Sequence, residues 1–295
     1  MAYSYGLWIP ETYFYQMHFL KEFYLRLTWL SIDVVLGAMG GMLFFSKLLR
    51  VDLVWEIYAL LGLTVWSIYT ADHLLDSRRK AEFDLSPRHQ FHARNQTLLV
   101  FALAIVVLLG LAGAYFVFGL GAELSWSLVL GVLIAGSMGL IRLAGNAVNG
   151  LKEISTALFY CLGIAWIPIL RADPLDMNWI FWAFFAGFSG LAFLNLLMLS
   201  FLDRKQDLAL GFSSAARLFS EVGLLNLIRR MAFLLIFLGL FGFIFLPSLY
   251  KFQACLLLIM CLIHYLSFFN SKLTADEVRM RTEAAFMLPW FLVLL

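Results

Sequence analysis

Residues 98–120 read LLVFALAIVVLLGLAGAYFVFGL, a run without one charged side chain. A helix needs about 20 consecutive apolar residues to cross the hydrocarbon core of a bilayer. A transmembrane β-barrel would instead show segments of about ten residues in which apolar and polar side chains alternate. This stretch therefore predicts a membrane-spanning α-helix and excludes a barrel.

The composition of the whole chain agrees with this stretch. Of the 295 residues, 63% are hydrophobic and 14% are charged, and the mean hydropathy is +0.88. Soluble domains are about half apolar and a quarter charged. Because no polar stretch is long enough for a separate soluble domain, we predict one all-α membrane domain over residues 1–295, surrounded by membrane lipids. The net charge of +2 gives no reason to expect a nucleic-acid partner.

The hydrophobic pattern predicts a polytopic transmembrane bundle of about nine helices. We expect spans at residues 28–48, 52–76, 97–119, 123–143, 152–171, 178–203, 230–249, 251–270 and a short one at 284–295. Residues 1–26 combine aromatic and charged side chains and predict an interfacial amphipathic segment, which leaves 27–295 for the bundle. The same aromatic and acidic composition argues against a cleaved signal peptide.

Lysine and arginine residues are distributed unevenly between the two sides of the predicted membrane. All of the 21 except Lys47, Arg50, Arg171 and Lys251 fall on the side of the N-terminus and of the connections after the second, fourth, sixth and eighth spans. Cytoplasmic connections carry such an excess of positive charge. We therefore expect a multi-pass protein whose N-terminus and charged connections face the cytoplasm.

Two acidic motifs end the second and the sixth span. Residues 66–76 read WSIYTADHLLD, and residues 199–207 read LSFLDRKQD. The pairs Asp72 and Asp76, and Asp203 and Asp207, have the spacing DxxxD, which places two carboxylates on one helical face. Mg²⁺ prefers one or two carboxylates together with water and phosphate oxygens. Each pair is therefore a candidate metal site at the cytoplasmic side, and solvated helix-end charges are the alternative.

The equal separation of the two motifs suggests a duplication. Spans one to four and five to eight would then be two pseudo-repeated four-helix halves, as in other membrane proteins built from repeats. Each half would carry one acidic pair to a central cleft.

At these residues the sequence resembles the UbiA superfamily of intramembrane prenyltransferases. Residues 203–219, DRKQDLALGFSSAARLF, look like the second aspartate motif of that family and its Gly-x-Lys-Ser continuation. The pair Asp72 and Asp76 matches the first aspartate motif. Arg88 resembles the family's Arg-Pro element, and Lys152 resembles the Lys of its Lys-Arg pair. The resemblance covers the motifs and the helix layout over nearly the whole chain.

Four positions depart from the family pattern. Ile68 stands in place of Asn, Gln206 in place of Asp, Glu153 in place of Arg, and Ser213 in place of Lys. Each departure removes a metal or phosphate contact. Arg217 lies one helical turn beyond Ser213, so we hypothesise that it supplies the missing cation on the same face.

The resemblance implies a prenyl diphosphate substrate, Mg²⁺ as cofactor and a lipophilic or aromatic acceptor. The catalytic and metal-binding role falls to Asp72, Asp76, Asp203 and Asp207, directly or through water. Phosphate binding falls to Arg88, Lys152, Arg217 and Arg204, although a positive-inside role explains Arg204 equally well. The neutralised diphosphate leaves, and the acceptor attacks the allylic cation.

Two other functions remain open on this scaffold. A terpene cyclase or lyase would need the same four aspartates and would quench the cation internally or with water. A non-catalytic lipid-binding or transport protein would have kept the fold while the metal site decayed, as Ile68, Gln206 and Ser213 suggest.

Several further residues carry a structural and a functional interpretation side by side. Asp33, inside the first span, either orients the acceptor or serves as its base, or it makes a structural hydrogen bond to a neighbouring helix. Asn195 and His264 present the same choice. His89 and His92 are candidates for a lid over the diphosphate, whereas Gly37 and Gly41 form a GxxxG pair typical of close helix packing. Cys161, Cys255 and Cys261 lack metal-site spacing and are expected to pack.

Overall fold

The computed structural model describes residues 24–77, 87–144, 150–205 and 215–294, and in these ranges it contains helices and no β-strand. The long helices are α2 (Ile32–Leu48), α3 (Trp55–Ser77), α5 (Gln96–Phe118), α6 (Ala122–Ala144), α7 (Leu151–Arg171), α8 (Trp179–Leu202), α10 (Glu221–Phe245) and α11 (Ser248–Phe268). The short ones are α4 (Pro87–Arg94), η3 (Ala215–Arg217), α12 (Ala275–Ala285) and η4 (Leu288–Leu294). The all-α prediction is confirmed. The predicted interfacial segment lies outside the described residues except for its last three positions.

Six of the described helices, α5, α6, α7, α8, α10 and α11, are long and apolar enough to cross a membrane. They give the chain the character of a multi-pass membrane protein. Helix α2 has only 17 residues and is largely buried among its neighbours.

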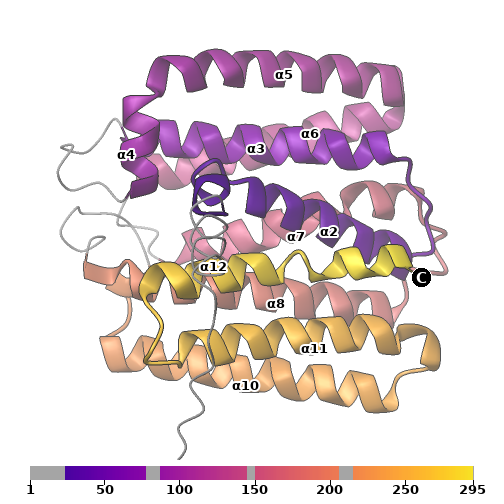
Figure 1. Cartoon of the computed structure of the whole chain (residues 1–295). Helices are drawn as coiled ribbons and strands as arrows, with labels where there is room; N and C mark the ends of the chain where they lie inside the picture. The colour runs from indigo at the N-terminus through magenta and orange to yellow at the C-terminus, as the bar shows by residue number, and fades with distance from the viewer. Residues whose placement is uncertain (1–23, 78–86, 145–149, 206–214, 295) are drawn as a thin grey trace, which may run out of the picture.

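Successive long helices run in opposite directions, so that their connections alternate between two ends of the bundle (Figure 1). Helices α3 and α8 finish, and α7, α10 and α12 begin, at one end, which we call the motif end. The predicted sorting of connections by charge follows this alternation.

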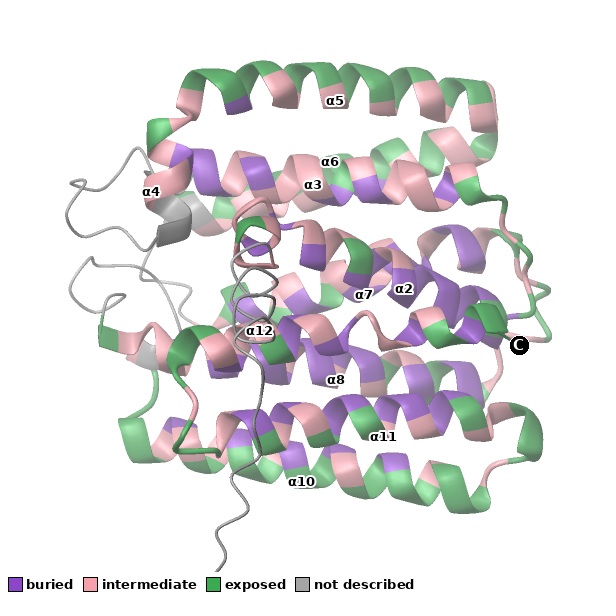
Figure 2. Cartoon of the chain, viewed as in Figure 1, coloured by how far each residue is buried: buried purple, intermediate pink, exposed green. Residues whose placement is uncertain are grey.

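The centre of the bundle is filled by aromatic side chains. Helices α2 and α8 have more buried residues than any other described helix, whereas α5 and α6 are largely exposed (Figure 2). The Phe188 ring lies 5.4 Å from that of Phe44 and 5.5 Å from that of Phe45, measured between ring centroids. Such offset ring pairs add to the stabilisation that comes from burial. The bundle is therefore packed at these positions.

Two grooves of about 380 and 400 Å³ lie elsewhere, at the opposite end: the first lies between α11 and η4, and the second is lined by η4 and Met287. Phe252, Cys255 and Ile259 line the first groove, and Phe291 and Leu294 line both. Neither groove contains a residue of the two acidic motifs.

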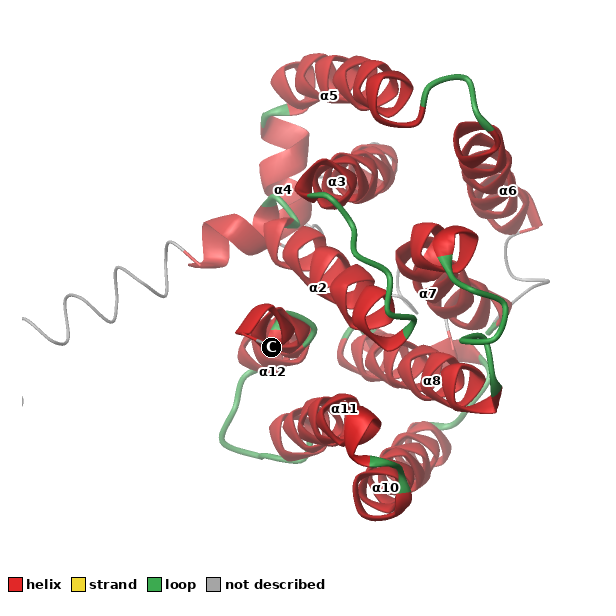
Figure 3. Ribbon diagram, turned by 90° about the vertical axis from the view of Figure 1, so that its right-hand side faces the viewer, coloured by secondary structure: helices red, strands yellow, loops and turns green. Residues whose placement is uncertain are grey.

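Helices α2, α3, α5 and α6 make up the first four-helix set, and α7, α8, α10 and α11 make up the second. The two sets meet through their first helices, α2 and α7. Seen along the bundle, α2 lies among α3, α7, α8 and α12 (Figure 3). A Cβ atom on Gly41 would lie 2.6 Å from Ile164 Cδ1 of α7, and one on Gly37 would lie 2.9 Å from Phe286 Cβ. The predicted packing role of this GxxxG pair is confirmed.

Two predicted helix boundaries were wrong. Helix α10 begins at Glu221, not near residue 230, because Ser220 caps it by accepting a hydrogen bond from the Gly223 N–H. Its internal Arg229 lies 5.1 Å from the centroid of the Phe269 ring, which explains how a charge fits within the helix.

The last predicted span, 284–295, is not one continuous helix, because it contains the end of α12 and the separate helix η4. Helix α12 starts at Ala275 behind a capping box of Thr274 and Glu277 and ends at Ala285. The chain continues as η4, in which Pro289 has no N–H to extend an α-helical ladder. Trp290 Nε1 donates a hydrogen bond of 2.9 Å to the Leu36 carbonyl oxygen and ties η4 to α2.

Candidate functional site

The two helices that bear the acidic motifs, α3 and α8, finish at the same end of the bundle (Figure 1). Asp72 is a half-buried residue near the end of α3, and Asp203 is the C-cap of α8. Asp76 lies in the last turn of α3, but its side chain is outside the described part. Asp207 lies wholly outside the described residues.

Asp203 is bound by a guanidinium that comes from α12. Arg279 Nη2 donates a hydrogen bond of 2.6 Å to Asp203 Oδ2. A carboxylate at a helix C-terminus faces the negative end of the helix dipole and is unfavourable without a cation. Arg279 supplies that cation, and its side chain is 24% exposed against 40% for Asp203.

Arg279 faces several carboxylates. Burial, the largest influence, lowers the pKa of its guanidinium, but Asp203, Glu283 and Asp276 raise it, and the net shift is upward. The guanidinium therefore stays charged. The capping box at Thr274 and Glu277 is the sequence signal that would have placed Arg279 in a helix.

Glu153 is a second residue that the sequence interpretation treated only as a departure. It is 6% exposed, and its Oε1 accepts a 2.6 Å bond from the Ala215 N–H and a 3.4 Å bond from Ser200 Oγ. It thereby joins α7, α8 and η3 at the motif end. Glu153 Oε2 is buried without a hydrogen-bond partner among the described residues.

The predicted phosphate-binding residues are placed as follows. Lys152 is exposed at the start of α7, and Arg217 ends η3 with a buried Nε that has no hydrogen-bond partner in the described part of the chain. Arg204 Nη1 donates a 3.0 Å bond to the Phe219 carbonyl oxygen. Arg88 lies in α4, and its side chain is outside the described part. All four lie on segments at the motif end.

The histidines of this end pack inward. His92 of α4 is 1% exposed, and its ring centroid lies 5.0 Å from that of His73, the residue after Asp72. His92 thus fixes α4 against α3. The His89 side chain, the other member of the predicted lid, is outside the described part.

Two polar residues inside the predicted spans have hydrogen-bond partners in their own helix. Asp33 is 2% exposed, and its Oδ1 accepts a 2.9 Å bond from the Val34 N–H. His264 Nδ1 lies 2.8 Å from the Met260 carbonyl oxygen, and its ring meets the Phe286 ring edge-on at 5.4 Å. Both of these hydrogen bonds are made within one helix, and the two interpretations of these residues remain predictions. Asn195 is buried in α8, and its Oδ1 has no hydrogen-bond partner among the described residues.

The donors at the motif end fit Mg²⁺ by their chemistry. Asp72 and Asp203 offer carboxylate oxygens, the ligands that this cation prefers. The Asp203 carboxylate keeps an oxygen besides the one bonded to Arg279. Among the described side chains, however, no three His, Cys, Asp or Glu residues gather closely enough to hold a metal, and Asp76 and Asp207 are not in that set.

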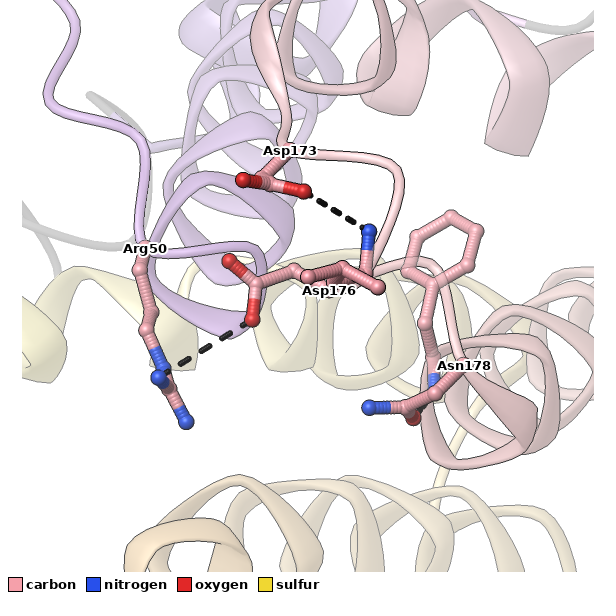
Figure 4. A network of polar contacts seen from close by, with 6 residues as sticks. Arg50, Asp173, Asp176 and Asn178 are labelled. Carbon is pink, nitrogen blue, oxygen red and sulfur yellow. Dashed lines mark hydrogen bonds and ion pairs between the residues drawn. The ribbon is translucent and has the colours of Figure 1, made fainter.

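The opposite end is neutralised by its own ion pairs. Arg50, after α2, lies 3.9 Å from Asp176, while Asp173 Oδ1 accepts the Leu175 N–H (Figure 4). Arg171 binds Glu123 with two nitrogens, Nε and Nη2, each at 2.8 Å. At the motif end, by contrast, the Nε atoms of Arg217 and Arg279 are buried without a hydrogen-bond partner among the described residues.

No protein-family model matches the sequence, and no curated protein matches it. Among solved structures, the chain is similar to the apo structure of a UbiA homolog from Aeropyrum pernix K1. The TM-score is 0.56, with 15% identity over 88% of this chain and 98% of that chain. The chain therefore has the fold of a UbiA homolog, which confirms at the level of the fold the resemblance drawn from its motifs.

Proposed function

We propose that the chain is an Mg²⁺-dependent intramembrane prenyltransferase that moves an isoprenyl group from a prenyl diphosphate to a lipophilic acceptor. One observation carries the proposal: in a bundle with the fold of a UbiA homolog, the helices that bear the two acidic motifs end on the same side. Asp72, Asp76, Asp203 and Asp207 would hold the metal, and the site would face the cytoplasm.

The residues of the motif end then have separate tasks. The four aspartates would hold Mg²⁺, and the charge neutralisation that the cation supplies would make the diphosphate a leaving group. Lys152, Arg88, Arg217 and Arg204 bind the remaining phosphate oxygens, and the buried Nε of Arg217 is an unfilled donor for one of them. Glu153 holds the Ala215 backbone and with it the turn that carries Arg217.

A non-catalytic lipid-binding or transport protein is the second candidate. The ion pair between Arg279 and Asp203 favours it, because an internal cation then neutralises a motif carboxylate without a metal. In that case the motif end would need neither Mg²⁺ nor a diphosphate.

Pyrophosphate release separates these candidates. Purified protein would be incubated with geranyl, farnesyl and geranylgeranyl diphosphate, with Mg²⁺ or EDTA, and with or without a lipid extract of the native organism. We expect release that requires both Mg²⁺ and the extract. Pyrophosphate release without extract would indicate a cyclase or lyase. The absence of pyrophosphate release under all conditions would support the non-catalytic candidate.

A further inference from the structure

The Arg279 guanidinium uses its donors incompletely. Only Nη2 bonds Asp203, while Nε is buried without a hydrogen-bond partner among the described residues. Arg171 shows the alternative in the same chain, because its Nε and Nη2 both bond Glu123. A planar guanidinium prefers such two-point contacts with carboxylate or phosphate. The contact of Arg279 with Asp203 is thus a one-point ion pair.

The setting of Arg279 also differs from that of a surface ion pair. It belongs to the first half of α12 and lies at the motif end, next to the C-terminus of α8. The residue after Asp203, Arg204, points to the Phe219 carbonyl oxygen, and Arg217 follows on the same connection. Three arginines from two segments therefore lie around the end of α8, and two of them, Arg217 and Arg279, keep a buried, unfilled Nε.

We propose that Arg279 is a further anion-binding residue of this site, which binds a phosphate group in competition with Asp203. The proposal rests on the proposed function, since it assigns the ligand as a diphosphate. A phosphate offers several oxygens to the guanidinium fork, whereas Asp203 bonds a single nitrogen. When a phosphate displaces Asp203, the carboxylate becomes free to accept other donors or a cation.

A double-mutant cycle without metal tests this competition. Binding of inorganic pyrophosphate would be measured calorimetrically in EDTA for wild type, Asp203→Asn, Arg279→Met and the double variant. Asp203→Asn keeps the side-chain shape and removes the charge of the carboxylate that is bonded to Arg279, so we expect it to tighten binding about tenfold. Arg279→Met is expected to weaken binding about tenfold, and in its background Asp203→Asn is expected to bring no gain.

Two controls exclude trivial causes. Arg281→Met removes a charge from an exposed residue of the same helix and is expected to leave binding within about twofold. Arg279→Lys keeps the positive charge at this position. The thermal midpoint of each variant reports whether that variant folds. An equal gain from Asp203→Asn in both backgrounds, or wild-type binding by a folded Arg279→Met protein, would overturn the proposal and leave a structural ion pair.

The result of this binding cycle can be distinguished from the result of the turnover assay that tests the proposed function. The cycle contains no metal and no prenyl chain, so it does not depend on turnover. Coupling without turnover of any prenyl diphosphate would leave an anion site on a protein that is not a transferase. Turnover without coupling would leave the transferase in place and remove Arg279 from its site.

Discussion

Glu153 is a buried carboxylate whose partner is a backbone amide from a distant part of the chain. Replacing it by Ala would leave the buried Ala215 N–H without an acceptor, at a cost of about 1–3 kcal/mol. We expect Glu153→Ala to lower the thermal midpoint in detergent clearly and Glu153→Gln to lower it less, because the amide oxygen still accepts. Glu221→Ala, at an exposed position, is the matched control. Equal midpoints for Glu153→Ala and wild type would contradict this role.

Residue-scale contacts of this kind were the least accessible to sequence reasoning. Arg279 and Asp203 are separated by 76 positions, and Glu153 and Ala215 by 62. Neither pair shares a helix, so no periodicity connects them. The acidic motifs were visible because both members of each pair lie one helical turn apart.

At the scale of elements, the approach of the broken C-terminal helix to α2 depends on two glycines. A methyl group on Gly37 would lie 2.9 Å from Phe286 Cβ, and one on Gly40 would lie 3.3 Å from the Phe286 carbonyl oxygen. We expect Gly37→Ala to destabilise the protein by about 1–3 kcal/mol, because α12 and η4 must shift. Thermal unfolding in detergent measures this loss.

Gly163 on α7 provides the control, since no heavy atom lies within 4 Å of the position of an added Cβ. Gly163→Ala is expected to be neutral or slightly stabilising, because Ala favours the helix more than Gly does. A Gly37→Ala protein as stable as Gly163→Ala would show that the C-terminal segment packs on α2 differently.

Element boundaries were predictable where apolar runs are continuous. The spans expected at 97–119 and 123–143 correspond to α5 and α6 within a residue at each end. The start of α10 was missed because Arg229 and Arg230 look like a helix end, although Phe269 accommodates the first of them. Helix α12 was missed because its polar residues resemble a connection, and its contacts with α11, α2 and α8 show what it covers.

At the scale of the whole molecule, the alternation of helix ends predicts which connections share a side of the membrane. Leu175 and Ser271 are exposed on connections at opposite ends. We expect a Leu175→Cys protein lacking the native cysteines to react with a membrane-impermeant maleimide in intact bacterial cells, since the positive-inside rule places that end outside. Ser271→Cys is expected to react only after permeabilisation. The reverse labelling pattern would place the motif end outside the cytoplasm.

The proposed metal dependence of the motif end joins all of these scales, because it would need one carboxylate pair from each half of the bundle. The measurement is Mg²⁺-dependent release of pyrophosphate from farnesyl diphosphate, with lipid extract, by wild type, Asp72→Ala and Asp207→Ala. Asp173→Ala, at the opposite end, serves as control. We expect each motif variant to lose at least about 100-fold in rate while the control stays active. Wild-type release by either motif variant at saturating Mg²⁺ would contradict a shared metal and diphosphate site.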